Sequence, residues 1–146
     1  MSEERQFSTF EIDGHLFGVP VLEVQEVIRF QEMTQVPLAP PTVGGLINLR
    51  GQIVMAIDLR RRLEFPDRED GKLPMNVVVN TADGAISLLV DEIRDVVEVT
   101  EDSFAPPPDT LAGVARELID GVYKFDDRLL LSLDVHKAVL ATSEAA

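Results

Sequence analysis

Two segments of the chain, 45–57 and 121–133, carry the same pattern at a constant offset of 76 residues. In each, two apolar stretches flank a short polar turn, which predicts a β-hairpin. Gly51 permits the tight reversal in the first copy, because glycine adopts positive φ without strain. Arg50 stands beside it at the tip, so we expect this side chain to be displayed and not buried. Asp126 occupies the same place in the second copy.

The rest of the chain repeats in the same order, which predicts two pseudo-repeats, 7–63 and 76–141, within a single domain spanning 1–146. Each repeat opens with an Asp-Gly turn between apolar segments, a hairpin signal, and closes with an aspartate able to cap a helix. The paired features are, in order, the turns at 13–14 and 83–84, the segments 21–28 and 90–97, the proline-rich connections at 37–41 and 106–108, and Asp58 and Asp134.

The predicted class is all-β with small helices, because each half offers about five short strands and then one short helix. The strands 53–57 and 129–133 are apolar at nearly every position, which is typical of strands covered on both faces. We therefore expect two barrel-like halves that share one continuous core. Pro66 limits the first helix, whereas the last can run to about Ala141. The charged segment 67–72 is interpreted as a solvated loop between the halves.

Composition excludes several classes of function. The chain has 146 residues, 26 acidic against 13 basic side chains and a net charge of -13, a field that repels nucleic acids and anionic lipid. It has no cysteine, so disulfides and thiolate sites are absent. The N-terminal residues lack a signal core, and no apolar run approaches the roughly 18 residues of a membrane helix. A cytoplasmic protein is expected.

Residues that could carry catalysis or bind a cofactor do not converge in the sequence. His15 and His136 lack ligand spacing to a partner, and no phosphate-binding glycine pattern is present. We therefore expect no catalytic residue, metal or cofactor. The six acids of 91–102 are interpreted as a solvated, aggregation-resistant edge strand. An enzyme with a carboxylate site in the cleft between the halves stays open as an alternative, although no pair of acids is nominated.

The two hairpins share their apolar positions and differ at their tips. Asn48, Arg50 and Gly51 stand where the second copy has Lys124, Asp126 and Asp127. One interpretation is that the tip of the first hairpin contacts a partner. The other is that Arg50 forms a surface ion pair with an acid such as Glu26, a contact that usually contributes little to stability.

At these residues the chain resembles the CheW family, the coupling proteins of bacterial chemotaxis. The likeness extends from about Phe7 to Leu140, and its strongest matches are the segments 24–27, 45–59, 89–91 and 95–96, with Asn-Leu-Arg-Gly at 48–51. The resemblance implies two SH3-like five-stranded β-barrels around a shared core. In this family a strand can join the barrel of the opposite half, so the sequence halves need not be the spatial ones.

The resemblance also implies two partners and no enzymatic activity. The partners are the regulatory domain of the histidine kinase CheA and the cytoplasmic tip of a chemoreceptor, with a possible higher-order array at the membrane. A chain of this length has no room for a kinase or receiver domain, which favours a stand-alone adaptor; a paralogue that serves another chemosensory pathway, such as surface motility, is the alternative. The implied receptor-binding residues are Val24, Glu26, Asn48, Arg50 and Ile93, and the implied kinase-binding residues are Leu38, Val43 and Gly44.

Overall fold

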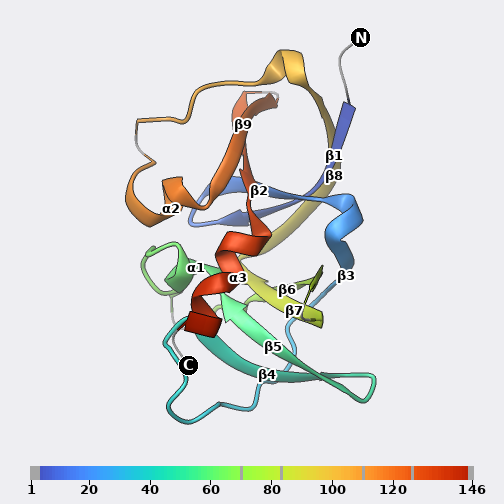
Figure 1. The fold of residues 1–146 in the computed structure, drawn as a ribbon, viewed down its shortest axis with the longest axis vertical. Coiled ribbons are helices and arrows are strands. Elements are labelled where there is room, and N and C mark those ends of the chain that lie inside the picture. The colour runs from blue at the N-terminus through green and yellow to red at the C-terminus, as the bar shows by residue number, and fades with distance from the viewer. Residues whose placement is uncertain (1–3, 70, 83, 110, 126, 145–146) are drawn as a thin grey trace.

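The computed structural model describes residues 4–69, 71–82, 84–109, 111–125 and 127–144. Within them the chain is mostly β-structure with short helical segments (Figure 1). The strands are β1 (Glu4–Ile12), β2 (His15–Pro20), β3 (Val24–Ile28), β4 (Val43–Leu49), β5 (Gln52–Asp58), β6 (Met75–Thr81), β7 (Gly84–Val90), β8 (Glu92–Thr100), β9 (Ile119–Phe125) and β10 (Arg128–Leu133). The helices are α1 (Leu59–Arg62), α2 (Gly113–Glu117) and α3 (Val135–Glu144), with 3-10 turns η1 (Val21–Glu23) and η2 (Glu101–Ser103).

The strands form two five-stranded sheets that exchange their hairpins. Sheet A has the order β8-β1-β2-β10-β9, and sheet B has the order β3-β6-β7-β5-β4. The N-terminal hairpin β1–β2 therefore joins the C-terminal strands, whereas the middle hairpin β6–β7 joins β3, β4 and β5. When β1–β5 are matched in sequence with β6–β10, the two strand orders are the same. Each sheet thus combines one hairpin from one half of the sequence with three strands from the other.

The two sheets are strongly curved but not closed by a continuous ladder. An isolated bridge joins Thr34 to Leu46 near the edge of sheet B, and another joins Phe104 to Tyr123 near the edge of sheet A. The all-β class with two five-stranded units is confirmed. The expected barrels are open, however: within the described residues, the edges of each sheet are joined by a single bridge instead of by a fifth strand pairing.

The larger of two clusters of buried residues lies between the sheets, as expected from the apolar strands, and a smaller one is formed by strands of sheet A alone. One cross-strand row runs over each sheet on the face that contacts the larger cluster. In sheet A the row is Ile93, Phe10, Phe17, Leu131 and Val122, and in sheet B it is Val24, Val79, Ile86, Met55 and Leu46. All but Ile93 are buried in the first row, whereas only Val79 is buried in the second. Sheet B therefore keeps a half-exposed apolar strip.

The turns and caps follow local sequence signals. Asp13 and Gly14 have φ values of 52° and 81°, as a two-residue hairpin turn requires; Asp83 lies outside the described residues. The Asp58 carboxylate accepts a hydrogen bond from the Arg60 backbone N–H at 3.1 Å, which caps α1, and Asp134 does the same for α3 through Lys137. Two differences remain: α3 extends three residues beyond Ala141, and α2 is a single helical turn too short to leave a periodic pattern.

The helices occupy the space between the sheets. In Figure 1, α1 and α3 lie between the part formed by β1, β2, β8 and β9 and the part formed by β4–β7. Arg62 of α1 donates hydrogen bonds to the carbonyls of Lys137 and Ala138 in α3, at 3.0 and 2.9 Å. The two helices are thereby held to one another as well as to the core, which fixes the orientation of the sheets that they cover.

Candidate functional site

The tip of the β4–β5 hairpin has the geometry that displays a side chain. Arg50 and Gly51 have φ values of 53° and 88°, so both adopt the left-handed conformation of a tight hairpin turn. The Asn48 side-chain carbonyl accepts a hydrogen bond from the Gly51 N–H at 2.9 Å. The Arg50 side chain is 77% exposed. The expectation that Arg50 is displayed is confirmed.

Arg50 forms a bidentate ion pair with Glu26. Its two terminal nitrogens donate to the two carboxylate oxygens at 2.7 and 2.9 Å. These hydrogen bonds hold the pKa of Glu26 below its usual range. The ion pair considered as an alternative at the level of sequence therefore exists. It leaves the outer face of the guanidinium open to solvent, so it is compatible with contact to a partner.

This ion pair connects the two edges of sheet B. Glu26 lies on β3, at one end of the strand order, and Arg50 lies at the tip of the hairpin that includes β4, at the other end. The sheet must curl for the two side chains to meet. The pair therefore ties the open barrel at the place where a strand pairing is missing.

Two apolar side chains are close in sequence to the ion pair, although Val24 pairs with Val79 and Glu26 with Val78, which puts Val24 and Glu26 on opposite faces of sheet B. Val24 is half-buried and begins the strip of sheet B, and Ile53, which pairs with Asn48 across the hairpin, is 61% exposed. Four of the five implied receptor residues thus belong to the facing edges of one sheet. Ile93 lies on β8 of sheet A, at the position of its row that matches Val24, and packs against the shared core. The structure therefore groups Val24, Glu26, Asn48 and Arg50 and places Ile93 in the other sheet.

The three implied kinase residues lie around the other end of β4. Leu38 has a φ of 65° and is fully exposed, on the proline-rich connection. Val43 and Gly44 begin β4 and line a hollow of about 640 Å³. A Cβ at Gly44 would approach Leu89 Cδ1 at 2.7 Å, so a larger residue there would require the Leu89 side chain to shift. Leu38 is the most accessible of the three.

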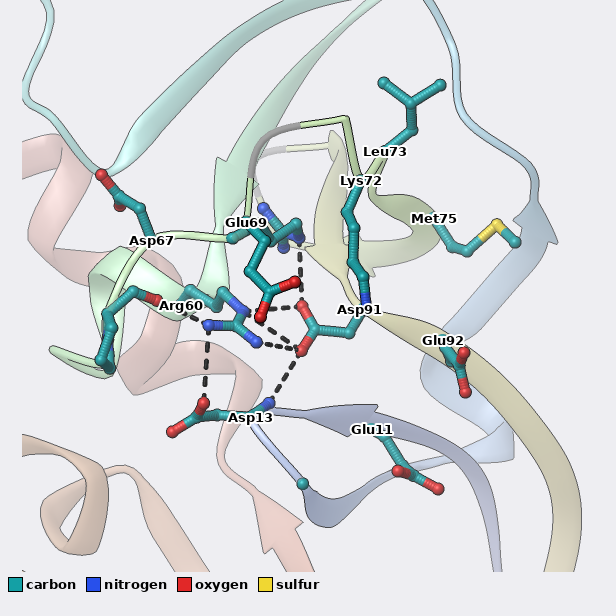
Figure 2. Close-up of a pocket in the computed structure, with 13 residues that line it drawn as sticks. Glu11, Asp13, Arg60, Asp67, Glu69, Lys72, Leu73, Met75, Asp91 and Glu92 are labelled. Carbon is teal, nitrogen blue, oxygen red and sulfur yellow. Dashed lines mark hydrogen bonds and ion pairs between the residues drawn. The ribbon is translucent and has the colours of Figure 1, made fainter.

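Figure 2 shows a cluster of charged side chains where the two sheets meet. The Asp91 carboxylate accepts hydrogen bonds from the Asp13 backbone N–H at 2.8 Å and from Arg60 at 2.8 to 3.1 Å. Arg68 adds an ion pair at 3.0 Å. Burial raises the pKa of Asp91, but the hydrogen bonds from Arg60 and Asp13 outweigh it, so the net shift is downward. This Asp91 cluster borders a hollow of about 720 Å³.

The sequence analysis missed this cluster. It assigned Asp91 to a solvated strand and Arg68 to a solvated loop, yet the Arg68 side chain is only 11% exposed and the Asp91 side chain 20%. Both assignments were wrong. The two side chains can be mostly buried because the arginines neutralise the carboxylate. One signal was available in the sequence: the first repeat has Leu22 at the position of Asp91, so the acid is not part of the pattern that the repeats share.

The remaining polar groups of the described residues have structural contacts. Among the described residues, no group of three or more His, Cys, Asp or Glu side chains is arranged to hold a metal ion. The His15 ring stacks on Phe65 with centroids 5.5 Å apart, which is a packing contact. Burial, followed by the charges of Asp120 and Asp134, raises the pKa of Glu23. Asp134 itself caps α3.

The described part of the chain has no helix that is both long and apolar enough to cross a membrane.

Comparison with known proteins identifies the family. A family model described as the CheW-like domain matches residues 6–142. The chain is 30% identical over 139 residues to a chemotaxis protein CheW of Treponema pallidum, covering 92% of this chain and 82% of that protein. It is also 30% identical over 140 residues to the chemotaxis protein CheW of Thermotoga maritima, covering 94% and 89%.

A solved structure gives the same result for the fold. The scaffolding protein TtCheW from Thermoanaerobacter tengcongensis superimposes with a TM-score of 0.82 at 27% identity, covering 93% of this chain and 92% of that one. The family model, the relatives and the shared architecture all extend over nearly the whole chain, from the first strand to the last helix. The chain therefore belongs to the CheW-like domain family.

Proposed function

We propose that this protein is a non-enzymatic cytoplasmic adaptor that couples the tip of a chemoreceptor to the histidine kinase CheA. The names of its relatives, chemotaxis protein CheW and a scaffolding protein, support this role. The observation that carries it is the displayed arginine of the β4–β5 hairpin, paired with Glu26 on a sheet that also keeps a half-exposed apolar strip. A sheet that is charged at its edge and keeps apolar surface is suited to binding a protein.

The receptor contact follows from the shape of the partner. A receptor tip is a helical hairpin, and an amphipathic helix binds by laying apolar side chains along an apolar strip. Val24 and the strip of sheet B would supply that contact, with Ile93 of sheet A on its far side. Arg50 and Glu26 would fix the orientation of the helix at the edge. A partly desolvated arginine often dominates such an interface.

The kinase contact is assigned to the surface around the proline-rich connection. Leu38 offers a fully exposed apolar side chain, and Val43 and Gly44 line the hollow behind it. This surface lies at the opposite end of β4 from the Arg50 tip. The two partners could then bind one sheet at the same time, which is what coupling requires. Array formation with the kinase is part of the same proposal.

The test is a titration of a receptor-tip fragment and of a kinase regulatory domain by calorimetry, each alone and both together. We expect Arg50→Ala to weaken receptor binding by at least about tenfold, or about 1.4 kcal/mol, because the arginine is central to the contact. Kinase binding and the fold should persist. Arg128→Ala is the matched control, because Arg128 is 41% exposed, follows the equivalent turn of sheet A and pairs with Glu11 at 3.1 Å.

Two outcomes would contradict the proposal. If Arg50→Ala and wild type bind the receptor fragment equally, the hairpin tip is not the contact. If wild type binds neither partner, the protein serves another chemosensory pathway or acts as an enzyme instead.

A further inference from the structure

We propose that Asn48 is a positioning residue: its side chain holds the hairpin turn in the conformation that carries Arg50 to Glu26, and it affects a partner only through Arg50. The family resemblance implies that Asn48 belongs to the receptor contact itself. The geometry assigns it a different task. This inference rests on the proposed receptor contact of Arg50.

The first argument is the conformation of the turn. Leu49 pairs with Gln52, so only Arg50 and Gly51 form the loop, and both have positive φ. Gly51 adopts this conformation freely, but an arginine in the left-handed region is disfavoured, because its Cβ lies too close to the following carbonyl oxygen. Some interaction must offset that strain in the folded chain.

The second argument is what Asn48 contacts. Its side-chain carbonyl accepts the Gly51 N–H at 2.9 Å, across the residue that carries the strain. An asparagine that bonds to the backbone a few residues ahead stabilises a turn in this way. This bond takes up the carbonyl end of the side chain and directs it along the hairpin. Asn48 is thereby committed to the loop that presents Arg50.

The third argument comes from the matching hairpin of sheet A. Lys124 stands at the position of Asn48, and an ammonium group has no acceptor for a backbone N–H. The supported turn is therefore a property of the hairpin that displays Arg50. The turn thus fixes the backbone of Arg50, and the guanidinium then pairs with Glu26.

The experiment compares Asn48→Ala, Asn48→Asp, Arg50→Ala and the double variant Asn48→Ala/Arg50→Ala, with Lys124→Ala as the matched control. Each is titrated with the receptor-tip fragment, and amide exchange of Gly51 is followed by NMR in the free protein. Loss of one hydrogen bond predicts receptor binding about fivefold weaker for Asn48→Ala. The Gly51 amide should exchange faster in that variant. Asn48→Asp retains an acceptor oxygen, so it should restore both properties, and Lys124→Ala should change neither.

The decisive comparison is the double variant. If Asn48 acts through Arg50, Asn48→Ala weakens binding no further once Arg50 is alanine. An additional loss in the double variant, or a failure of Asn48→Asp to rescue, would mean that Asn48 touches the partner directly and would overturn the inference. If wild type does not bind the receptor fragment, the proposed function fails. The Gly51 exchange rates of Asn48→Ala and Asn48→Asp then decide the role of Asn48 in the turn.

Discussion

Sheets A and B have the same strand order, yet different side chains hold their edges and different fractions of their inner faces are covered. The edges of sheet B are tied by Arg50 and Glu26. In sheet A the residue that matches Glu26 is Asp95, which is exposed, and the residue that matches Arg50 is Asp126, outside the described part of the chain.

The apolar rows of the two sheets also differ in how deeply they are buried. The apolar row of sheet A is buried from Phe10 to Val122, whereas the row of sheet B is half-exposed at Val24, Ile86, Met55 and Leu46. Sheet A therefore contributes mainly to the core. Sheet B leaves apolar surface available, and the Arg50–Glu26 ion pair joins its edges. Both sheets contribute buried residues to the core, and sheet B in addition carries the surface to which the proposed function assigns the partners.

The largest expected effect tests the difference in cover. Leu131 and Met55 occupy matching positions in the two rows, and Leu131 is 2% exposed. Leu131→Ala should lower the free energy of unfolding by about 3 kcal/mol, because it leaves a cavity in a closed core. Met55→Ala removes a half-exposed side chain and should lower it by about 1 kcal/mol. Urea denaturation measures both, and equal losses would contradict the asymmetry between the sheets.

A smaller loss is expected at the point where the sheets are joined. Asp91→Asn should lower the free energy of unfolding by about 2 kcal/mol, because Arg60 and Arg68 lose their shared carboxylate and keep only Asp13 and Asp58, respectively, in a site that is only partly solvated. Asp95→Asn, an exposed acid on β8, is the control and should change little. If the two variants are equally stable, the Asp91 cluster does not hold the sheets together.

The loss of stability in Asp91→Asn should depend on pH. The pKa of Asp91 is lowered in the folded protein, so its contribution is complete above the unfolded-state value of about 3.9. It is lost as the pH falls from there through the folded-state pKa. The difference in stability between wild type and Asp91→Asn should therefore be constant near neutral pH and disappear in acid. Thermal unfolding at several pH values measures it, and a difference that survives acid would exclude Asp91 as the cause.

The smallest effect on stability is expected for a variant that tests whether the Arg50–Glu26 pair joins the edges of sheet B, binds the receptor, or does both. Exchanging the charges, with Glu26→Arg and Arg50→Glu in one chain, keeps an ion pair across the edges and should leave unfolding almost unchanged. Receptor binding should nevertheless fall by at least about tenfold, because the partner meets the opposite charge pattern. Each single reversal, which juxtaposes like charges, provides the control. Retained binding in the exchanged chain would mean that the pair serves only to close the sheet.

Local signals account for most of what could be predicted from the sequence. The Asp-Gly turn at 13–14, the caps at Asp58 and Asp134 and the display of Arg50 depend on residues within a few positions of one another. Backbone preference alone fixes such features. The all-β class follows in the same way, from the length and spacing of the apolar strands.

The missed features depend on residues far apart in the chain. Asp91 is satisfied by Arg60, Arg68 and the backbone of Asp13, and no short pattern records that these four residues meet. The exchange of hairpins is likewise invisible to periodicity, and only the family resemblance raised it. The division of the chain into pseudo-repeats 7–63 and 76–141 of a single domain stays a proposal, which the equal strand orders support.

The exchange of hairpins also dictates an order of assembly during synthesis. Sheet B can be completed once β7 has been made, but β2 of sheet A pairs Leu16 with Leu130 near the other end of the chain. The first hairpin can pair with β8 before then, but it gains its last neighbour only when β10 has been made, so the rings of Phe7, Phe10 and Phe17 are incompletely covered until that point. Such distant pairings slow folding and expose the chain to aggregation. The strands that are synthesised first therefore complete their pairing last.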